Sequence, residues 1–141
     1  MQWLMLQQEK PEDFVIASGR MATVRNFIEL TAKELGWNKD NESNPIIWEG
    51  KGVDEIGRRA DTGDIVIKID PKYFRPTEVE QLLGDPNKAF KKLGWKPKSS
   101  LEDLVKEMVL YDKEESLKEA LLRDRGFKVN SSKESPPSAI N

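Results

Sequence analysis

The chain has 141 residues, of which 37% are hydrophobic and 34% charged, and its 23 basic and 25 acidic residues leave a net charge of −2. This length fits one domain, and the balanced charge lacks the basic surface that would indicate nucleic acid or an anionic membrane as a partner. There is no cysteine, no histidine and no apolar run as long as a membrane span, which excludes disulfides, thiolate metal sites and histidine acid–base chemistry. We therefore expect a cytoplasmic protein that binds neither nucleic acid nor a membrane.

Residues 1–8 are mostly bulky and apolar, with no capping residue before them. A helix that starts with uncapped amides is an unusual natural beginning. We expect the second half of a helix entered from an upstream domain, and a frayed terminal helix is the alternative. Residues 14–17 are apolar and partly β-branched and end at Ser18-Gly19, which predicts a buried strand.

A helix is predicted over residues 24–35. Thr23 suits its N-cap and Gly36 its C′ position. The loop before the helix and the first helical turn therefore lie at a helix N-terminus, where anions are favoured. This makes Arg20 and Arg25 candidates for contacts with an anionic ligand, and each could equally be an ordinary charge near a helix end.

The middle of the chain is predicted to be a small sheet. Residues 46–48 form a short strand, and the runs 53–59 and 65–69 are separated by turn residues, which indicates a β-hairpin. Arg58 and Arg59 are adjacent on one strand, so their side chains point to opposite faces. We interpret them as charges that guard an exposed hairpin edge, rather than as an anion-binding pair.

Prolines stiffen residues 71–80, which follow the hairpin. Pro76 biases Arg75 towards an extended conformation, and Glu78 stands three positions further on. A guanidinium suits phosphate and a carboxylate accepts hydrogen bonds from hydroxyls, so this pair could hold a nucleotide by its diphosphate and its ribose. The ordinary alternative is a surface arginine and a glutamate that opens a helical turn.

The C-terminal part is predicted to be helical. A first helix spans residues 86–92 with Asp85 as its N-cap. Ser100 opens a second helix, in which Asp103 completes an approximate capping box and an apolar stripe follows. A third, separate helical pattern spans residues 116–125.

Several of these segments resemble the GDP-mannose 4,6-dehydratases, which are extended short-chain dehydrogenase/reductases. The longest shared motif, at residues 70–80, reads Asp-Pro-Lys-Tyr-Phe-Arg-Pro-Thr-Glu-Val-Glu. The others are residues 1–8, 11–19, 84–86 and 93–97. The motifs occur in the family's order from residue 1 to about Gly126.

The resemblance implies a mixed α/β fold. Residues 1–126 would form the C-terminal substrate-binding lobe of an extended short-chain dehydrogenase, cut at its start within a helix. The NAD(P)-binding Rossmann core of that family would be largely absent. Residues 127–141, rich in serine and proline towards their end, are predicted to be a disordered tail.

The resemblance also implies the substrate, GDP-mannose. In the family, Arg75 would contact the GDP diphosphate and Glu78 the ribose hydroxyls. The loop that corresponds to residues 19–22 lies beside the nucleotide sugar, which keeps Arg20 and Arg25 as substrate-binding candidates. The loop sequence itself departs from the commonest form in the family.

The family's reaction converts GDP-mannose to GDP-4-keto-6-deoxymannose, a step of GDP-fucose and deoxyhexose synthesis, and uses NADP with a Tyr-x-x-x-Lys pair. Here Thr77 stands four positions after Tyr73 and Glu115 four after Tyr111, and there is no Gly-x-Gly-x-x-Gly turn. We therefore expect no catalytic, cofactor-binding or metal-binding residue in this chain, and no activity of the chain alone.

The partners implied are GDP-mannose and a missing Rossmann lobe or full-length subunits, in a homo-oligomer that binds NADP. Two other readings remain: a non-catalytic module for sugar nucleotides or subunit contacts, and part of a related nucleotide-sugar epimerase or reductase. Without a Rossmann neighbour the side chains of Trp3, Leu4 and Leu6 would be exposed, so we expect low stability or association.

Overall fold

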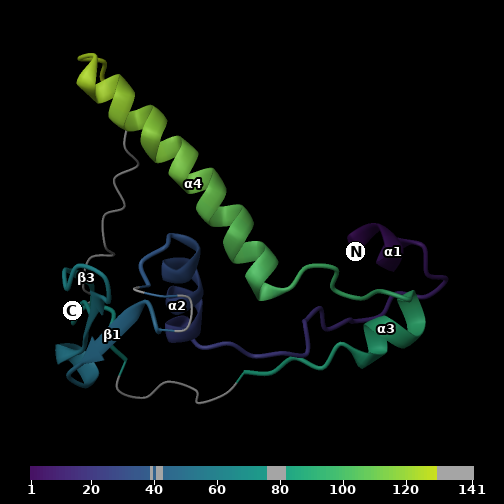
Figure 1. Ribbon diagram of the computed structural model, residues 1–141. Coiled ribbons are helices and arrows are strands. Elements are labelled where there is room, and N and C mark those ends of the chain that lie inside the picture. The colour runs from purple at the N-terminus through teal and green to yellow at the C-terminus, as the bar shows by residue number, and fades with distance from the viewer. Residues whose placement is uncertain (39, 41–42, 76–81, 130–141) are drawn as a thin grey trace.

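The structure is a computed structural model that describes residues 1–38, 40, 43–75 and 82–129. It is a mixed α/β arrangement, as predicted, with a small sheet beside α2 and a long helix α4 that runs away from it (Figure 1). The elements are α1 (Gln2–Leu6), α2 (Val24–Glu34), β1 (Ile46–Glu49), the 3-10 turn η1 (Gly52–Asp54), β2 (Ile56–Arg59), β3 (Ile65–Lys68), α3 (Asn87–Leu93) and α4 (Leu101–Asp124).

The sheet has three antiparallel strands in the order β1-β2-β3. Ile46 pairs with Arg59 across β1 and β2, and Ile56 pairs with Lys68 across β2 and β3. The predicted hairpin is confirmed as β2–β3. The predicted extended run 53–59 is shorter in the structure, because η1 occupies its first residues.

Arg58 and Arg59 lie on the central strand, so the prediction that they guard an exposed edge is wrong. The Arg58 Nε donates to the Glu49 carboxylate at 3.0 Å. Arg59 donates to both carboxylate oxygens of Asp61, at 3.0 and 2.7 Å, and its guanidinium lies 4.5 Å from the centre of the Trp37 ring. Both arginines therefore tie the sheet to its own turns and to the chain that follows α2.

Helix α2 has the ends that the sequence predicts. The Thr23 hydroxyl accepts a hydrogen bond from the Asn26 N–H at 3.0 Å. At the other end Gly36 adopts a φ of 76°, which suits glycine, and the Trp37 N–H reaches back to the Ala32 carbonyl at 3.0 Å. Ala32 is buried, and α2 packs against α4.

The buried core is small. Among the described residues only five hydrophobic side chains are buried, and the largest that is fully enclosed is Ile46. The others are Ala32, Ala60, Ala89 and Val105. Since hydrophobic stabilisation scales with the apolar area removed from water, alanines contribute little and this core gives the fold limited stability.

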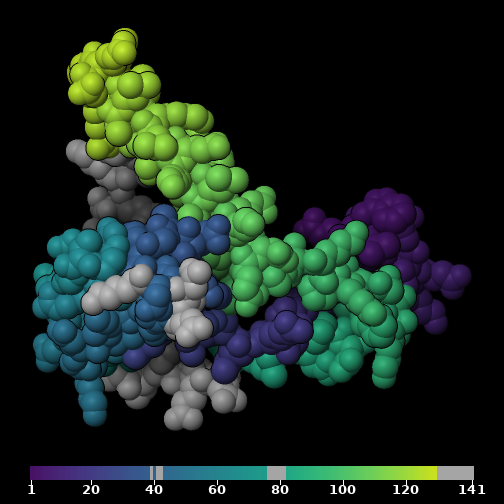
Figure 2. Space-filling model, in the orientation of Figure 1, coloured from purple at the N-terminus to yellow at the C-terminus, as the bar shows by residue number. Residues whose placement is uncertain are grey.

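Helix α4 is one continuous helix of 24 residues, which corrects the prediction of two helices. The residues between the two predicted patterns, 110–115, contain no glycine or proline, and several are strong helix formers. An ion pair between Glu115 and Lys118 at 2.5 Å adds local support. Figure 2 shows the far end of α4 projecting beyond the other described elements.

Residues 14–17 are not a strand, so that prediction is also wrong. Within the described residues this segment makes no backbone pairing, and Val15 and Ile16 are exposed. It lies instead against Gly84, where an added Cβ would be 2.6 Å from the Ala17 Cβ. An apolar, β-branched run becomes a strand only where a neighbouring strand is available to accept its hydrogen bonds.

Helix α3 holds the N-terminal segment by charge. It begins one residue later than predicted, with the Asp85 carboxylate accepting from the Asn87 N–H at 2.9 Å. The Lys92 ammonium donates to both oxygens of Glu12, at 2.5 and 2.7 Å, and Lys88 lies 3.1 Å from the same carboxylate. These lysines are exposed, yet they connect two parts of the chain about 80 positions apart.

Helix α1 is shorter than the predicted 1–8 and has no side-chain cap, as expected. Trp3 and Leu6 are exposed, which agrees with the expectation, whereas Leu4 is half-buried and does not. None of the described helices combines the length and the apolar character that crossing a bilayer requires.

Candidate functional site

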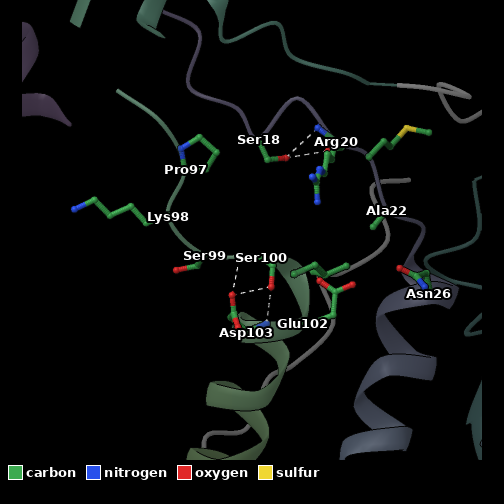
Figure 3. Close-up of a pocket in the computed structure, with 12 residues that line it drawn as sticks. Ser18, Arg20, Ala22, Asn26, Pro97, Lys98, Ser99, Ser100, Glu102 and Asp103 are labelled. Carbon is green, nitrogen blue, oxygen red and sulfur yellow. Dashed lines mark hydrogen bonds between the residues drawn. The ribbon is translucent and has the colours of Figure 1, made fainter. Parts of the chain in front are cut away.

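A surface cavity of about 530 Å³ lies between the loop before α2 and the segment that leads into α4 (Figure 3). Its lining comes from two stretches of chain about 75 positions apart, and each runs into the first turn of a helix. The lining residues are Ser18, Arg20, Met21, Ala22, Asn26, Pro97, Lys98, Ser99, Ser100, Leu101, Glu102 and Asp103.

The loop side of the cavity is shaped by Ser18. Its hydroxyl donates to the Arg20 carbonyl at 3.0 Å and accepts from the Arg20 N–H at 3.2 Å, which fixes a tight turn (Figure 3). The Arg20 side chain extends from this turn on the cavity side of the loop. Its guanidinium makes no hydrogen bond or ion pair with any residue that the structure describes, so its donors are available to a ligand.

The opposite side is the first turn of α4. Ser100 and Asp103 form the predicted capping box: the Asp103 N–H donates to the Ser100 hydroxyl at 3.0 Å, and the Asp103 carboxylate accepts from the Ser100 N–H at 2.9 Å. The hydrogen bonds from the Ser100 backbone and side chain lower the pKa of Asp103, so this carboxylate is charged at neutral pH. Because the Ser100 N–H already donates to the Asp103 carboxylate, this amide is not free to bind an incoming anion.

The cavity is therefore electrostatically divided. Arg20 offers phosphate a cation on the loop side. Asp103 and its neighbour Glu102 make the α4 side acidic, which suits hydroxyl donors and disfavours a second anion. Lys98 lines the rim, and its ammonium end points away from the α4 turn (Figure 3). A ligand that carries both phosphate and hydroxyl groups fits this division.

Arg25 does not line the cavity. Its guanidinium is paired with the Glu55 carboxylate and lies 4.7 Å from the centre of the Trp48 ring. The Trp48 indole N–H in turn donates to Glu29 at 2.8 Å. In this structure Arg25 joins α2 to the sheet, and its prediction as a ligand contact remains untested.

Arg75 is exposed and lies just after a turn at residues 71–73. Asp70 stabilises that turn by accepting from the Lys72 N–H at 2.9 Å and from the Tyr73 N–H at 3.0 Å. Arg75 does not line the cavity, and Glu78 lies outside the described residues. The structure thus places Arg20 at the cavity and leaves the Arg75–Glu78 pair as a prediction.

Local sequence patterns did not predict Asn26, Lys98 or Glu102 as cavity residues. The sequence predicted the N-caps of α2 and α4. No local sequence feature shows, however, that the starts of these two helices lie next to each other. No cluster of three or more potential metal ligands occurs in the part of the chain that the structure describes.

Fold and cavity together define a mixed α/β domain with a charged surface cavity. The sequence profile of a family described as GDP-mannose 4,6 dehydratase matches residues 1–108. A GDP-mannose 4,6-dehydratase of Yersinia enterocolitica is 47% identical over 96% of this chain and 37% of its own length. A Vibrio cholerae enzyme of the same name is 48% identical over 95% of the chain and 37% of its own length.

The human GDP-mannose 4,6 dehydratase is 47% identical over 79% of the chain and 28% of its own length. The chain belongs to the GDP-mannose 4,6-dehydratase family, which confirms the resemblance seen in the sequence motifs. It spans between about a quarter and two fifths of the length of these curated relatives.

Proposed function

We propose that this chain is the GDP-mannose-binding portion of a GDP-mannose 4,6-dehydratase. The enzyme would convert GDP-mannose to GDP-4-keto-6-deoxymannose with loss of water, within GDP-fucose and deoxyhexose synthesis. The observation that carries the proposal is the family match over residues 1–108, together with 47–48% identity to bacterial dehydratases across nearly the whole chain.

Residues 1–126 would act as the substrate-binding lobe, with the nucleotide held by Arg75 and Glu78. Arg75 has a fork of donors for the diphosphate, and Glu78 would accept hydrogen bonds from the ribose hydroxyls. Arg20 would supply a further cation at the cavity, where the acidic turn of α4 favours sugar hydroxyls over phosphate. Arg25 would need to leave Glu55 before it could contact a ligand.

The residues of this chain do not fit the cofactor of the proposed enzyme. The described sheet is antiparallel throughout, whereas dinucleotides bind at a parallel βαβ unit with a glycine-rich turn, and the sequence has no such turn. We therefore assign NADP and the acid–base residues to the portion of the relatives that this chain does not match. The chain alone would bind substrate without turning it over.

The proposed complete enzyme would join this lobe to a Rossmann portion and form a homo-oligomer. Binding energy at the nucleotide end would then position the sugar for chemistry on the Rossmann side. A cytoplasmic location belongs to the same proposal, because sequence composition supports it and nucleotide sugars are its expected substrate.

Calorimetric titration of GDP-mannose into the chain tests the proposal. A charge-assisted contact contributes about 1.5–3 kcal/mol, so Arg75→Ala should raise the Kd by about 10- to 100-fold. Arg123→Ala is the matched control, because Arg123 pairs with Glu119 on the far half of α4, and it should leave the Kd unchanged. Absence of binding by the wild-type chain, or equal Kd values for all three proteins, would contradict the proposal.

A further inference from the structure

The far half of α4 carries a stripe of leucines that covers nothing in the described structure. Leu110, Leu117 and Leu121 are 62%, 63% and 58% exposed. At 100° per residue they fall within about 40° of one another around the helix, and roughly 140° away from the buried Val105. The stripe therefore lies on the side of α4 away from the buried Val105, and α4 packs on α2.

Four charged residues flank this leucine stripe. Helical geometry places Lys113 and Asp124 on one side of it and Glu114 and Arg125 on the other. None of the four forms an ion pair with another residue that the structure describes. Each side thus carries one cation and one anion, about three turns apart along the helix.

The opposite face of the same helical segment differs. There four charges are paired within the helix, Glu115 with Lys118 at 2.5 Å and Glu119 with Arg123 at 3.1 Å, and Asp112 has no ion pair among the described residues. Most charges of this segment that lie away from the leucines are therefore paired within α4, whereas none of the four beside the leucines is paired within the described structure. This asymmetry is the pattern expected of a face whose charges pair with another molecule.

We propose that the leucine stripe binds the same stripe of a second copy of this chain, with the two α4 helices antiparallel. Leu117 of one copy would pack on Leu121 of the other, Lys113 would pair with Asp124, and Glu114 with Arg125. The midpoints of the three pairs all fall within about half a residue of 119, so the pairs can face each other across one two-fold axis.

Antiparallel pairing also brings opposite charges together on both sides of the leucine stripe. In an antiparallel helix pair, residues on one side of the apolar seam meet residues on the same side of the partner helix. The lone cation and anion on each side then meet their opposites, so the face is complementary to itself. Leu110 would face the partner beyond the end of its α4, so only Leu117 and Leu121 of each copy pack leucine on leucine. This interface is smaller than the roughly 1,200–2,000 Å² of stable complexes, and the dimer is therefore weak and depends on concentration.

Sedimentation equilibrium of the 141-residue chain with charge-swapped variants tests the pairing. The variant K113E/E114K places like charges opposite Asp124 and Arg125, and D124K/R125E does the same in reverse. Each should weaken dimerisation by about 10- to 100-fold. An equimolar mixture of the two variants, and the quadruple variant that carries all four changes, should each restore the wild-type dissociation constant.

The matched control is K106E/E107K, which swaps the same kinds of charge one heptad nearer the start of α4, beyond the proposed contact. It should dimerise like the wild type, and circular dichroism should show equal helix content for every variant. A wild-type chain that stays monomeric up to about 1 mM would overturn the proposal, because even a weak dimer with a Kd of about 100 μM would be mostly associated at that concentration. Dimerisation unaffected by the swaps, or not restored by combining them, would overturn it as well.

Discussion

At the scale of single residues, several charged side chains hold separate segments of the chain together. Arg25 is the clearest example, because its guanidinium meets the Glu55 carboxylate and lies over the face of Trp48. The Glu55 side chain is only 18% exposed, so it depends on a cation for compensation. Arg25 itself is half-exposed, which lets solvent screen the pair and limits its contribution to the free energy of folding.

We expect Arg25→Ala to lower the free energy of unfolding by about 1 kcal/mol, through loss of the ion pair and of the contact with the aromatic ring. Urea denaturation followed by tryptophan fluorescence measures the change. Lys51→Ala is a suitable control, because Lys51 is exposed and takes no part in any ion pair among the described residues. Equal stability of the two variants would show that the Arg25 contacts contribute nothing.

Residues whose role depends on their immediate neighbours were predictable from the sequence. Thr23 and Ser100 were identified as caps, because a cap needs only a hydroxyl and an amide two or three positions on. Arg58 and Arg59 were misjudged, because their role depends on the order of the strands, which the local sequence does not contain. Arg20 could be named as a candidate, but the acidic turn across the cavity from it could not.

At the scale of elements, the N-terminal segment and α3 are joined through one carboxylate. Lys92 and then Lys88 donate hydrogen bonds to Glu12, and these contacts lower the pKa of Glu12 below its ordinary 4.5. A carboxyl group whose pKa is lower in the folded state stabilises the fold above its unfolded pKa, and loses that effect as the pH falls through the folded pKa.

The variant Glu12→Gln should therefore be less stable than the wild type at pH 7, and the difference should shrink as the pH falls below 4.5. Denaturant titrations at about pH 7 and about pH 3.5 measure this change across the titration of the carboxyl group. Glu9→Gln is the control, since Glu9 is exposed and unpaired among the described residues. A stability difference of the same size at both pH values would rule out the ionised contact as its cause.

The helices were predicted better than the strands. The capping box and apolar stripe of α4 are local features, and both were found. Its continuity was missed because the apolar pattern weakens in the middle, where propensity alone maintains the helix. Residues 14–17 failed as a strand for the opposite reason: their composition was right, but a strand also needs a partner that the sequence of the segment cannot supply.

At the scale of the whole molecule, the described chain buries few hydrophobic side chains and leaves many large ones exposed. The core consists of three alanines, one valine and one isoleucine, while Leu6 and Leu82 are 81% and 80% exposed. Small domains bury a low fraction of their apolar surface and are marginally stable for that reason. The chain also spans only 37% of the length of the Yersinia and Vibrio relatives.

We expect the isolated 141-residue chain to melt below about 45 °C, the lower limit for typical mesophilic domains, or to aggregate on heating. Thermal unfolding by circular dichroism and binding of a hydrophobic dye measure the melting temperature and the exposed apolar surface. Strong dye binding before the transition is the expected result. A cooperative transition above about 65 °C without dye binding would be incompatible with the small core.

Because α4 is one uninterrupted helix, a small rotation near its start moves its far end by a larger distance. About 22 Å of helix separates Leu110 from Arg125, so a change of about 10° in the tilt of α4 would carry its tip roughly 4 Å sideways. Small adjustments beside Val105, near the charged cavity, are thereby magnified at the distant end. A fluorophore pair with one dye on a cysteine introduced at the tip would follow that swing cleanly, because the natural chain has no thiol to compete for the label.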